Sequence, residues 1–382
     1  MKTKFKIILM GFVLALGLCM CQERDMVQAQ NITDVPITVT YGQTEARSIL
    51  QMINNLRTNS KDAWYWNESN TQRIYCKGLS ELTYSYDLER IAMKRAAEIA
   101  LSYDHTRPNG QDCFTVYEEE NIDRMAVGEN IAAGYQSAKE VNKGWREDDQ
   151  KYSGQGHRRN MLDDSYNCVG IGHVYYNGTH YWVEEFGDTN ASGLQTVAND
   201  TSTQVTVSVL NSNITGINLK PVKSVKKTLT CGQTVTLPKY VVTLSIADNW
   251  GYGGDCPTDW EVTYTLSPTT IATLQDHSLT VNAPGKVEVV VSANGMSKKI
   301  QYTVLPVKYK ISQTKASLKT GKKLTLKVSG AAGKVIWTSS NKKIATVNKK
   351  GVVTAKKSGT VTIKAYCPEL KKTVKCKIKV YT

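Results

Sequence analysis

A repeated pattern in the second half of the chain is the sequence feature that most limits its possible folds. The tetrapeptide Ile-Ala-Thr-Leu at 271–274 recurs as Ile-Ala-Thr-Val at 344–347, and a glycine follows each copy, at Gly285 and Gly359. Upstream, the segment 228–237 resembles 317–326. Short alternating apolar and polar segments broken by Gly, Pro and Ser surround both copies, which is typical of β-sandwiches. The repeat therefore predicts two successive β-sandwich domains.

The first half of the chain has a different pattern, with helical periodicity followed by strand periodicity. Apolar residues recur at helical spacing from Leu88 to Tyr103, and Ser137 with Glu140 forms a capping box at the start of another expected helix. Two alternating segments, 169–176 and 179–186, flank Asn177-Gly178, the dipeptide that most favours a tight hairpin. This order predicts an α+β domain that ends near residue 190.

The N-terminus has the pattern of an export signal. Three lysines precede an apolar stretch from Ile7 to Cys21, and Val27-Gln28-Ala29 fits a small-residue cleavage site. We therefore expect residues 1–29 to be a signal peptide and residues 30–40 a linker. No later apolar stretch reaches 18 residues, so we predict an extracellular, secreted chain with no transmembrane segment.

Positive charge is concentrated at the C-terminal end. Residues 308–382 contain twenty lysines, no arginine and a single acid, Glu369, for a net charge of +19 within a chain total of +14. No nucleic-acid motif accompanies these lysines, so we expect no nucleic-acid partner. Two interpretations remain. In one, the electrostatic field of these lysines attracts an anionic cell-wall polymer or surface, and the protein is associated with the cell wall. In the other, the lysines only occupy the solvent-exposed strand faces and protect the sheet edges.

Seven cysteines follow the signal segment, and export makes them candidates for disulfides. We predict local pairs Cys231–Cys256 and Cys367–Cys376. Among Cys76, Cys113 and Cys168 we expect one bridge and one remaining thiol, with partners that the sequence does not settle. The alternative is that all seven are reduced and buried.

Three short strings and one spaced pair in the α+β region contain the candidate chemistry. The strings are His105–Gly110 (HTRPNG), Gly128–Gly134 (GENIAAG) and Gly156–Leu162 (GHRRNML). The pair is Trp145 with Asp148, three residues apart and within one helical turn, so the ring is expected to be buried while the carboxylate lines an edge.

These strings resemble the CAP superfamily, the SCP/TAPS domain of cysteine-rich secretory, antigen 5 and pathogenesis-related proteins. The resemblance covers residues 41–190 and implies a three-layer α-β-α sandwich. Residues 307–382 resemble the group-2 bacterial immunoglobulin-like domain, and residues 198–306 resemble it more loosely, as a divergent copy. The expected fold class is thus α+β, a CAP sandwich followed by two all-β immunoglobulin-like sandwiches.

The CAP resemblance implies an open cleft lined by two histidines and two acids. Matched by motif, these are His105, Glu129, Asp148 and His157. Asp148 departs from the family, which often has Glu there, and Glu147 is the neighbour that a different helix register would bring to this place. Imidazole nitrogens bind Zn²⁺ and carboxylates orient them, so we expect His105 and His157 as metal ligands, with Glu129 and Asp148 beside them.

Three functions follow from such a cleft. The protein is a secreted bacterial CAP protein that binds a metal or an unknown small ligand and is displayed at the cell surface by its immunoglobulin-like modules. Alternatively, it is a secreted metal-dependent hydrolase of the peptidase kind, with Glu129 as the base. In the third, the four side chains only brace the fold. The sequence does not decide whether the protein is an enzyme.

Overall fold

The computed structural model describes residues 31–123, 126–188, 194–247, 255–331 and 333–382, and the predicted signal peptide lies outside them. The contacts divide the chain into two units. The first unit contains the residues up to Val222 together with 240–262 and 293–296, and the second contains 223–239, 263–292 and 297–382.

All the α-helices of the described residues lie in the first unit. They are α2 (Gln43–Arg47), α3 (Ile49–Thr58), α4 (Tyr86–Ile99), α5 (Thr115–Glu119), α6 (Ala138–Arg146) and α7 (Gly156–Met161). The strands of this unit are β1 (Ile32–Tyr41), β2 (Trp64–Trp66), β3 (Arg73–Tyr75), β4 (Thr83–Tyr84), β5 (Val127–Ala133), β6 (Cys168–Tyr176), β7 (Thr179–Gly187), β8 (Ser202–Leu210), β9 (Ile214–Pro221), β12 (Tyr240–Ile246) and β13 (Asp255–Thr258).

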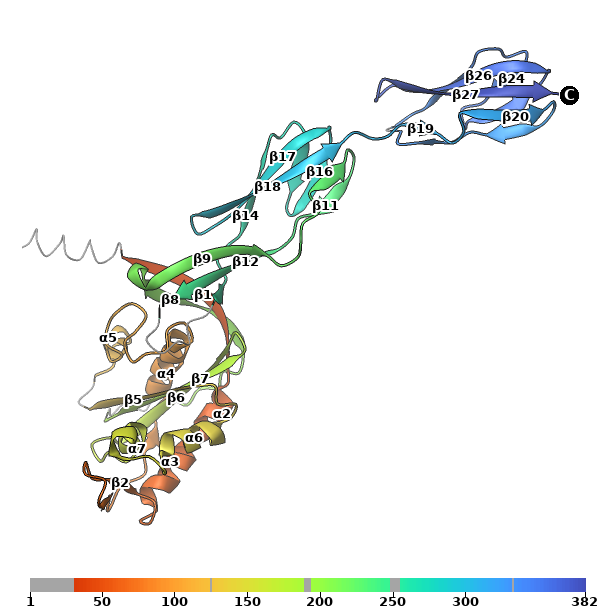
Figure 1. Ribbon diagram of the computed structural model, residues 1–382. Coiled ribbons are helices and arrows are strands. Elements are labelled where there is room, and N and C mark those ends of the chain that lie inside the picture. The colour runs from red at the N-terminus through yellow and green to blue at the C-terminus, as the bar shows by residue number, and fades with distance from the viewer. Residues whose placement is uncertain (1–30, 124–125, 189–193, 248–254, 332) are drawn as a thin grey trace, which may run out of the picture. The chain divides into compact units, whose positions relative to one another are not determined.

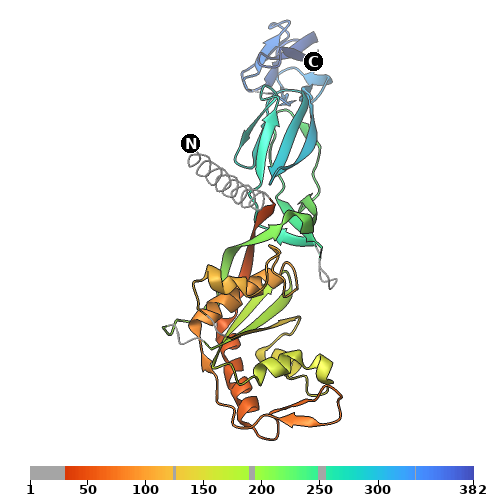
Figure 2. The ribbon, with the colours of Figure 1, turned by 90° about the vertical axis from the view of Figure 1, so that its left-hand side faces the viewer.

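A central sheet separates two helical layers in the first unit (Figure 1). Its strands follow the order β5-β7-β6-β1-β8, and β4 pairs with β6. Ala96 of α4 packs on one face of the sheet, against a core that includes Val183. On the other face, α3, α6 and α7 pack against a core that includes Trp182 (Figure 2). The predicted three-layer α-β-α arrangement is confirmed.

Local signals in the sequence explain why these elements form. The Ser137 hydroxyl accepts a hydrogen bond from the backbone N–H of Glu140 at the start of α6, which confirms the predicted cap. Asn177 and Gly178 both have positive φ angles, as the tight turn between β6 and β7 requires. A Cβ atom on Gly172 would lie 2.2 Å from the Ala92 carbonyl oxygen, so this glycine permits the close approach of α4 to β6.

Strands beyond residue 200 complete the first unit. Strand β8 pairs with β1 along its whole length, and β9, β12 and β13 form a separate sheet in the order β13-β12-β9. Leu244 and Ile246 of β12 belong to the same core as Val35 and Val39 of β1. Residues 198–306, which the sequence predicted as one domain, are thus divided between the two units.

The second unit contains two β-sandwiches with the same strand order. In one, the sheets are β10-β18-β17-β14 and β11-β16-β15; in the other, they are β20-β27-β26-β23 and β21-β25-β24, with β19 pairing β22. The strands are β10 (Thr228–Thr230), β11 (Thr234–Thr236), β14 (Thr263–Ser267), β15 (Ala272–Gln275), β16 (Ser278–Val281), β17 (Gly285–Ala293), β18 (Met296–Leu305), β19 (Lys310–Ile311), β20 (Lys315–Lys319), β21 (Lys323–Thr325), β22 (Val328–Ser329), β23 (Ile336–Ser339), β24 (Ala345–Val347), β25 (Val352–Ala355), β26 (Gly359–Cys367) and β27 (Lys372–Tyr381).

The repeat in the sequence corresponds to one packing contact made twice. A Cβ atom on Gly285 would lie 2.6 Å from Cδ1 of Ile271, and one on Gly359 would lie 2.8 Å from Cδ1 of Ile344. Each isoleucine therefore covers a glycine that cannot carry a side chain. The first sandwich differs by a long excursion after β11, whose strands β12 and β13 join the first unit.

The predicted disulfides are not formed, since none joins any of the seven cysteines among the described residues. Register explains the failure for Cys367 and Cys376. Cys376 of β27 lies opposite Ile363 of β26, four residues from Cys367. At about 3.4 Å per residue, this offset far exceeds the Cα separation of about 7 Å that a disulfide tolerates. Cys231 instead donates to the backbone oxygen of Asn282.

Among the described residues, none of the helices has both the length and the apolar character needed to span a bilayer.

Candidate functional site

Strand β5, at the edge of the central sheet, carries the centre of the predicted site. Glu129 and Asn130 are successive residues of this strand, so their side chains point to opposite faces of the sheet. The register places Glu129 opposite Glu185 and Asn130 opposite Glu184 on β7. All four side chains are buried. One edge strand thus supplies polar groups to both faces.

On the α4 face, His105 is held by Glu129 and Arg95. The Nδ1 atom of His105 lies 2.7 Å from Oε1 of Glu129. The Arg95 Nε donates to Oε2 of the same carboxylate at 2.7 Å, and its Nη2 donates to the backbone oxygens of Asp104 and His105. Arg95 is wholly buried and therefore fixes both the carboxylate and the loop that carries the histidine.

The pKa values of two buried carboxyls on this face are shifted in opposite directions. Burial alone would raise the pKa of Glu129, but the Arg95 guanidinium and the hydrogen bond with His105 bring it well below its usual range. Burial, followed by the negative charge of Glu129, raises the pKa of Glu185 well above its usual range. The Tyr117 hydroxyl donates to Glu185 at 3.0 Å. Their surroundings therefore favour the ionised form of Glu129 and the protonated form of Glu185.

The second histidine, His157, is held by Glu147 and not by Asp148. Helix α6 ends at Arg146, and Glu147 takes a left-handed conformation with φ of 47°. This turn brings Oε1 of Glu147 to 2.5 Å from Nδ1 of His157. Asp148 instead accepts hydrogen bonds from Arg158 at 2.6 Å and Arg146 at 3.0 Å. Glu147 thus takes the place that the sequence assigned to Asp148.

Two asparagines connect His157 to strand β5. Asn130 donates to the backbone oxygen of His157 at 3.2 Å and to the carboxyl of Glu184 at 2.8 Å. Asn160 of α7 donates to the Asn130 side chain at 2.9 Å and to the backbone oxygen of Glu129 at 3.2 Å. The two histidines are therefore linked through strand β5: His105 contacts it through Glu129, and His157 contacts it through Asn130.

Both histidines have the same orientation relative to their carboxylates. Each uses Nδ1 toward a glutamate, which leaves Nε2 as the nitrogen that a ligand could approach. The side chains of His105 and His157 are 55% and 34% exposed, whereas Glu129 and Glu147 are 1% and 12% exposed. Such carboxylate–imidazole pairs fix the ring orientation and raise the basicity of the outer nitrogen.

A thiol lies beside the first pair. The ligand atoms of His105, Cys113 and Glu129 lie within 4.8 Å of one another, the one such group of three that the described residues provide. Burial, then the charges of Glu129 and Glu185, raises the pKa of the Cys113 thiol. A neutral thiol is a poor ligand or nucleophile, so in this state it packs rather than reacts.

The other two histidines of the first unit are structural. His173 stacks on Trp182 with ring centroids 3.5 Å apart, and its Nε2 lies 2.8 Å from Nδ1 of His180. Burial lowers the pKa of His173 to about 4. Its imidazole is therefore neutral and serves as part of the core.

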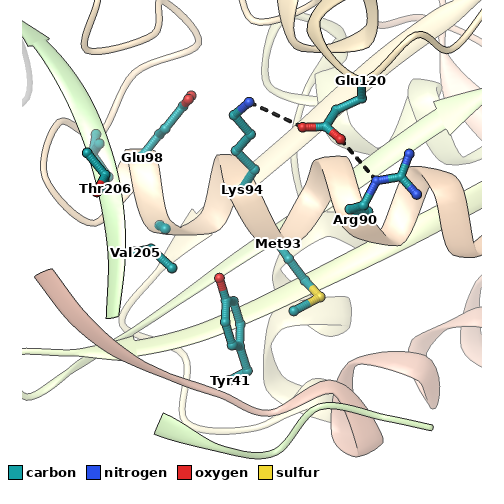
Figure 3. Close-up of a pocket in the computed structure, with 10 residues that line it drawn as sticks. Tyr41, Arg90, Met93, Lys94, Glu98, Glu120, Val205 and Thr206 are labelled. Carbon is teal, nitrogen blue, oxygen red and sulfur yellow. Dashed lines mark hydrogen bonds and ion pairs between the residues drawn. The ribbon is translucent and has the colours of Figure 1, made fainter. Parts of the chain in front are cut away.

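A hollow of about 300 Å³ lies between α4 and β8, and Figure 3 shows the side chains that line it. Tyr41, Met93 and Val205 form its apolar wall, and Lys94 pairs with Glu120 at its rim, 3.3 Å apart. A second hollow, of about 440 Å³, lies at the end of α7 and is lined by Asn160, among others. Neither is lined by His105 or His157, so neither belongs to the paired histidines.

The sequence offered Glu147 only as an alternative to Asp148, and it did not identify Arg95, Glu184 and Glu185 as members of the candidate site. Glu184 and Glu185 had a signal, because these consecutive glutamates lie between the apolar residues Val183 and Phe186 of one strand. Arg95 had none, since one arginine on an amphipathic helix is normally exposed.

Comparison with known families identifies two domains. Residues 50–186 match the cysteine-rich secretory protein family (CAP), and residues 308–378 match the bacterial Ig-like domain (group 2). The chain therefore contains a CAP domain and a group-2 bacterial immunoglobulin-like domain.

Individual relatives are distant. The uncharacterized protein YkwD of Bacillus subtilis (strain 168) is 27% identical over 112 residues, which cover 29% of this chain and 40% of that protein. An extracellular protein containing an SCP domain from Bacillus anthracis is 18% identical, with coverage of 38% of this chain and 40% of the other and a TM-score of 0.29. Domains 4 and 5 of the S-layer protein SbsC are 20% identical, with coverage of 44% and 100% and a TM-score of 0.29.

Proposed function

We propose that this protein is exported and binds a divalent metal ion or a small polar ligand through its two histidine–glutamate pairs. The observation that carries the proposal is the repeated geometry. In both pairs Nδ1 faces a glutamate, at 2.7 Å for His105 and 2.5 Å for His157, and Nε2 is left for a ligand. A role in bracing alone does not require the rings to remain accessible.

The donor set suits zinc. Zn²⁺ prefers imidazole nitrogens, and carboxylates that orient those imidazoles strengthen binding. His105 and His157 would hold the ion, while Glu129 and Glu147 would orient them. An ion bound there would polarise a ligand oxygen.

Binding is favoured over hydrolysis by the state of Glu129. A general base works best with a pKa near the operating pH. Because Arg95 and His105 hold the pKa of Glu129 well below its usual range, this carboxylate accepts protons poorly. We therefore place metal or ligand binding ahead of a metal-dependent hydrolase.

Attachment to an anionic cell surface is the second part of the proposal. The support is the net charge of +19 in residues 308–382, together with the export signal expected from residues 1–29. The Ig-like modules would then display the CAP domain outside the cell.

Zinc titration of the chelator-stripped protein tests the binding site. We expect stoichiometric uptake in the wild type and its loss in both His105→Ala and His157→Ala. His277→Ala is the matched control, since this histidine lies in the second unit, where its ring packs edge to face against Tyr264. Uptake that survives His157→Ala but not His105→Ala would move the site to the group with Cys113. If the wild type takes up no zinc and neither variant affects ligand binding, the four side chains only brace the fold.

A further inference from the structure

The outer face of the C-terminal sheet β20-β27-β26-β23 carries a cluster of lysines. Exposed and buried residues alternate along β27, so one face of this strand packs on the core and the other faces solvent. The same alternation holds in β26 and β20. The exposed lysines of this face are Lys315, Lys319, Lys364, Lys375, Lys377 and Lys379. We call these six residues the lysine face.

The pairing register places like charges directly opposite each other on this face. Lys364 lies opposite Lys375, and Lys315 lies opposite Lys377. Like charges in opposed positions destabilise a sheet. None of the ion pairs found among the described residues includes a lysine of this face, and Glu369 is the sole acid of residues 308–382. The sheet thus carries repulsion that an external anion would relieve.

The fold itself does not require these lysines, as the other sandwich of the same strand order shows. The exposed positions of β18, which occupies the place of β27, include Gln301 and Thr303. Lys299 of this strand forms an ion pair with Glu288 at 3.0 Å. Protection of edges does not explain the lysine face either. Three of its members lie on β27, which has a neighbour on both sides.

We propose that the lysine face binds a linear polyanion with phosphodiester groups, such as a wall teichoic acid. The proposal rests on the surface attachment proposed above and assigns it to one face and one chemical class. Lysines at alternate positions of a strand lie about 6.8 Å apart, and neighbouring strands lie about 4.8 Å apart, which gives a grid of cations for an extended chain. Thr360, Thr362 and Ser317 add hydroxyl donors between the lysines.

A wall polymer fits this face better than a membrane does. Peripheral membrane binding combines basic residues with a contiguous apolar surface that inserts into the lipid. The exposed apolar side chains of this face are divided between its two ends, with Ile336 and Tyr366 at one and Tyr381 at the other. Lysine is also suited to a flexible polymer, because it acts as a point charge and does not demand the planar bidentate geometry of arginine.

The test compares two variants of equal net charge. The face variant carries Lys364→Gln, Lys375→Gln, Lys377→Gln and Lys379→Gln. Its affinity for purified, lipid-free wall teichoic acid should fall at least about tenfold, and log Kd should depend less steeply on log salt between about 50 and 200 mM. Because opposed like charges are removed, its melting temperature should be no lower than that of the wild type.

The control variant carries Lys342→Gln, Lys343→Gln, Lys349→Gln and Lys350→Gln, four exposed lysines outside the lysine face. We expect its affinity for the polymer to fall by about threefold or less. Equal losses in the two variants would overturn the proposal, because total charge and not the face would then determine binding. Vesicles with anionic lipid form the second arm. A face variant that loses vesicle binding but keeps polymer binding would also overturn it, in favour of a membrane.

The failure of this proposal is distinguishable from failure of the surface attachment. Wild-type protein that binds purified cell walls while the face variant binds them equally well contradicts the lysine face alone. Wild-type protein that binds no wall material contradicts the attachment itself.

Discussion

Replacing Arg95 by methionine removes a buried cation from between two buried carboxylates while keeping most of the side-chain volume. The Arg95 guanidinium contacts Glu129 and Glu98, each at 2.7 Å, and is 0% exposed. Loss of one partner of a buried ion pair costs about 3–5 kcal/mol. Glu98 keeps Arg107 at 2.7 Å and Glu129 keeps His105, so we expect the lower end, about 3 kcal/mol.

Arg90→Met on the same helix is the matched control. Arg90 is 51% exposed and pairs with Asp87 and Glu120, and such surface pairs are worth about 0–1 kcal/mol. Urea unfolding, followed by tryptophan fluorescence, reports on this unit because Trp145 and Trp182 are buried in it. A difference of about 2 kcal/mol shifts the midpoint by about 1 M. Equal midpoints for the two variants would refute the role assigned to Arg95.

Two other predictions follow from buried or positioning carboxyls. Burial raises the pKa of Glu184 to about 8 from 4.5, so wild-type stability falls as pH rises between these values, by about 1.4 kcal/mol per pKa unit at most. Glu184→Gln should make the free energy of unfolding, measured by urea titration, depend less on pH between pH 5 and 8. Glu68→Gln, at an exposed site, is the control and should leave this dependence unchanged. Equal pH dependence in the wild type and in Glu184→Gln would contradict the prediction. Glu147→Gln should weaken zinc binding about 10–100-fold in calorimetry, while Asp148→Asn should change it little; the reverse order would restore Asp148 to the site.

The proximity of His105 and Glu129 was predictable from the resemblance to the CAP superfamily, which implies that both line one cleft. The choice between Glu147 and Asp148 was not. Counting three residues from Trp145 assumes a continuing helix, but the chain leaves helical geometry at Glu147 with a positive φ. A non-glycine residue in the left-handed region leaves little trace in a sequence, and one such residue rotates the following side chains away.

The sequence repeats predicted the strand topology of the sandwiches, but they did not show which elements each strand packs against. The Ile271 and Ile344 motifs predicted two sandwiches, and the structure gives both the same strand order. Strands β12 and β13 follow β11 of the first sandwich along the chain, yet their core residues pack with those of β1. Periodicity identifies which face of a strand is buried, but not which unit buries it.

The paired histidines are tested most directly by a crystal of the chain soaked with zinc and measured at the zinc absorption edge. We predict anomalous density about 2.0–2.1 Å from Nε2 of His105 and from Nε2 of His157, with both Nδ1 atoms still on Glu129 and Glu147. Density on Nδ1, density on Cys113 without His157, or no density at either ring would contradict the proposed site.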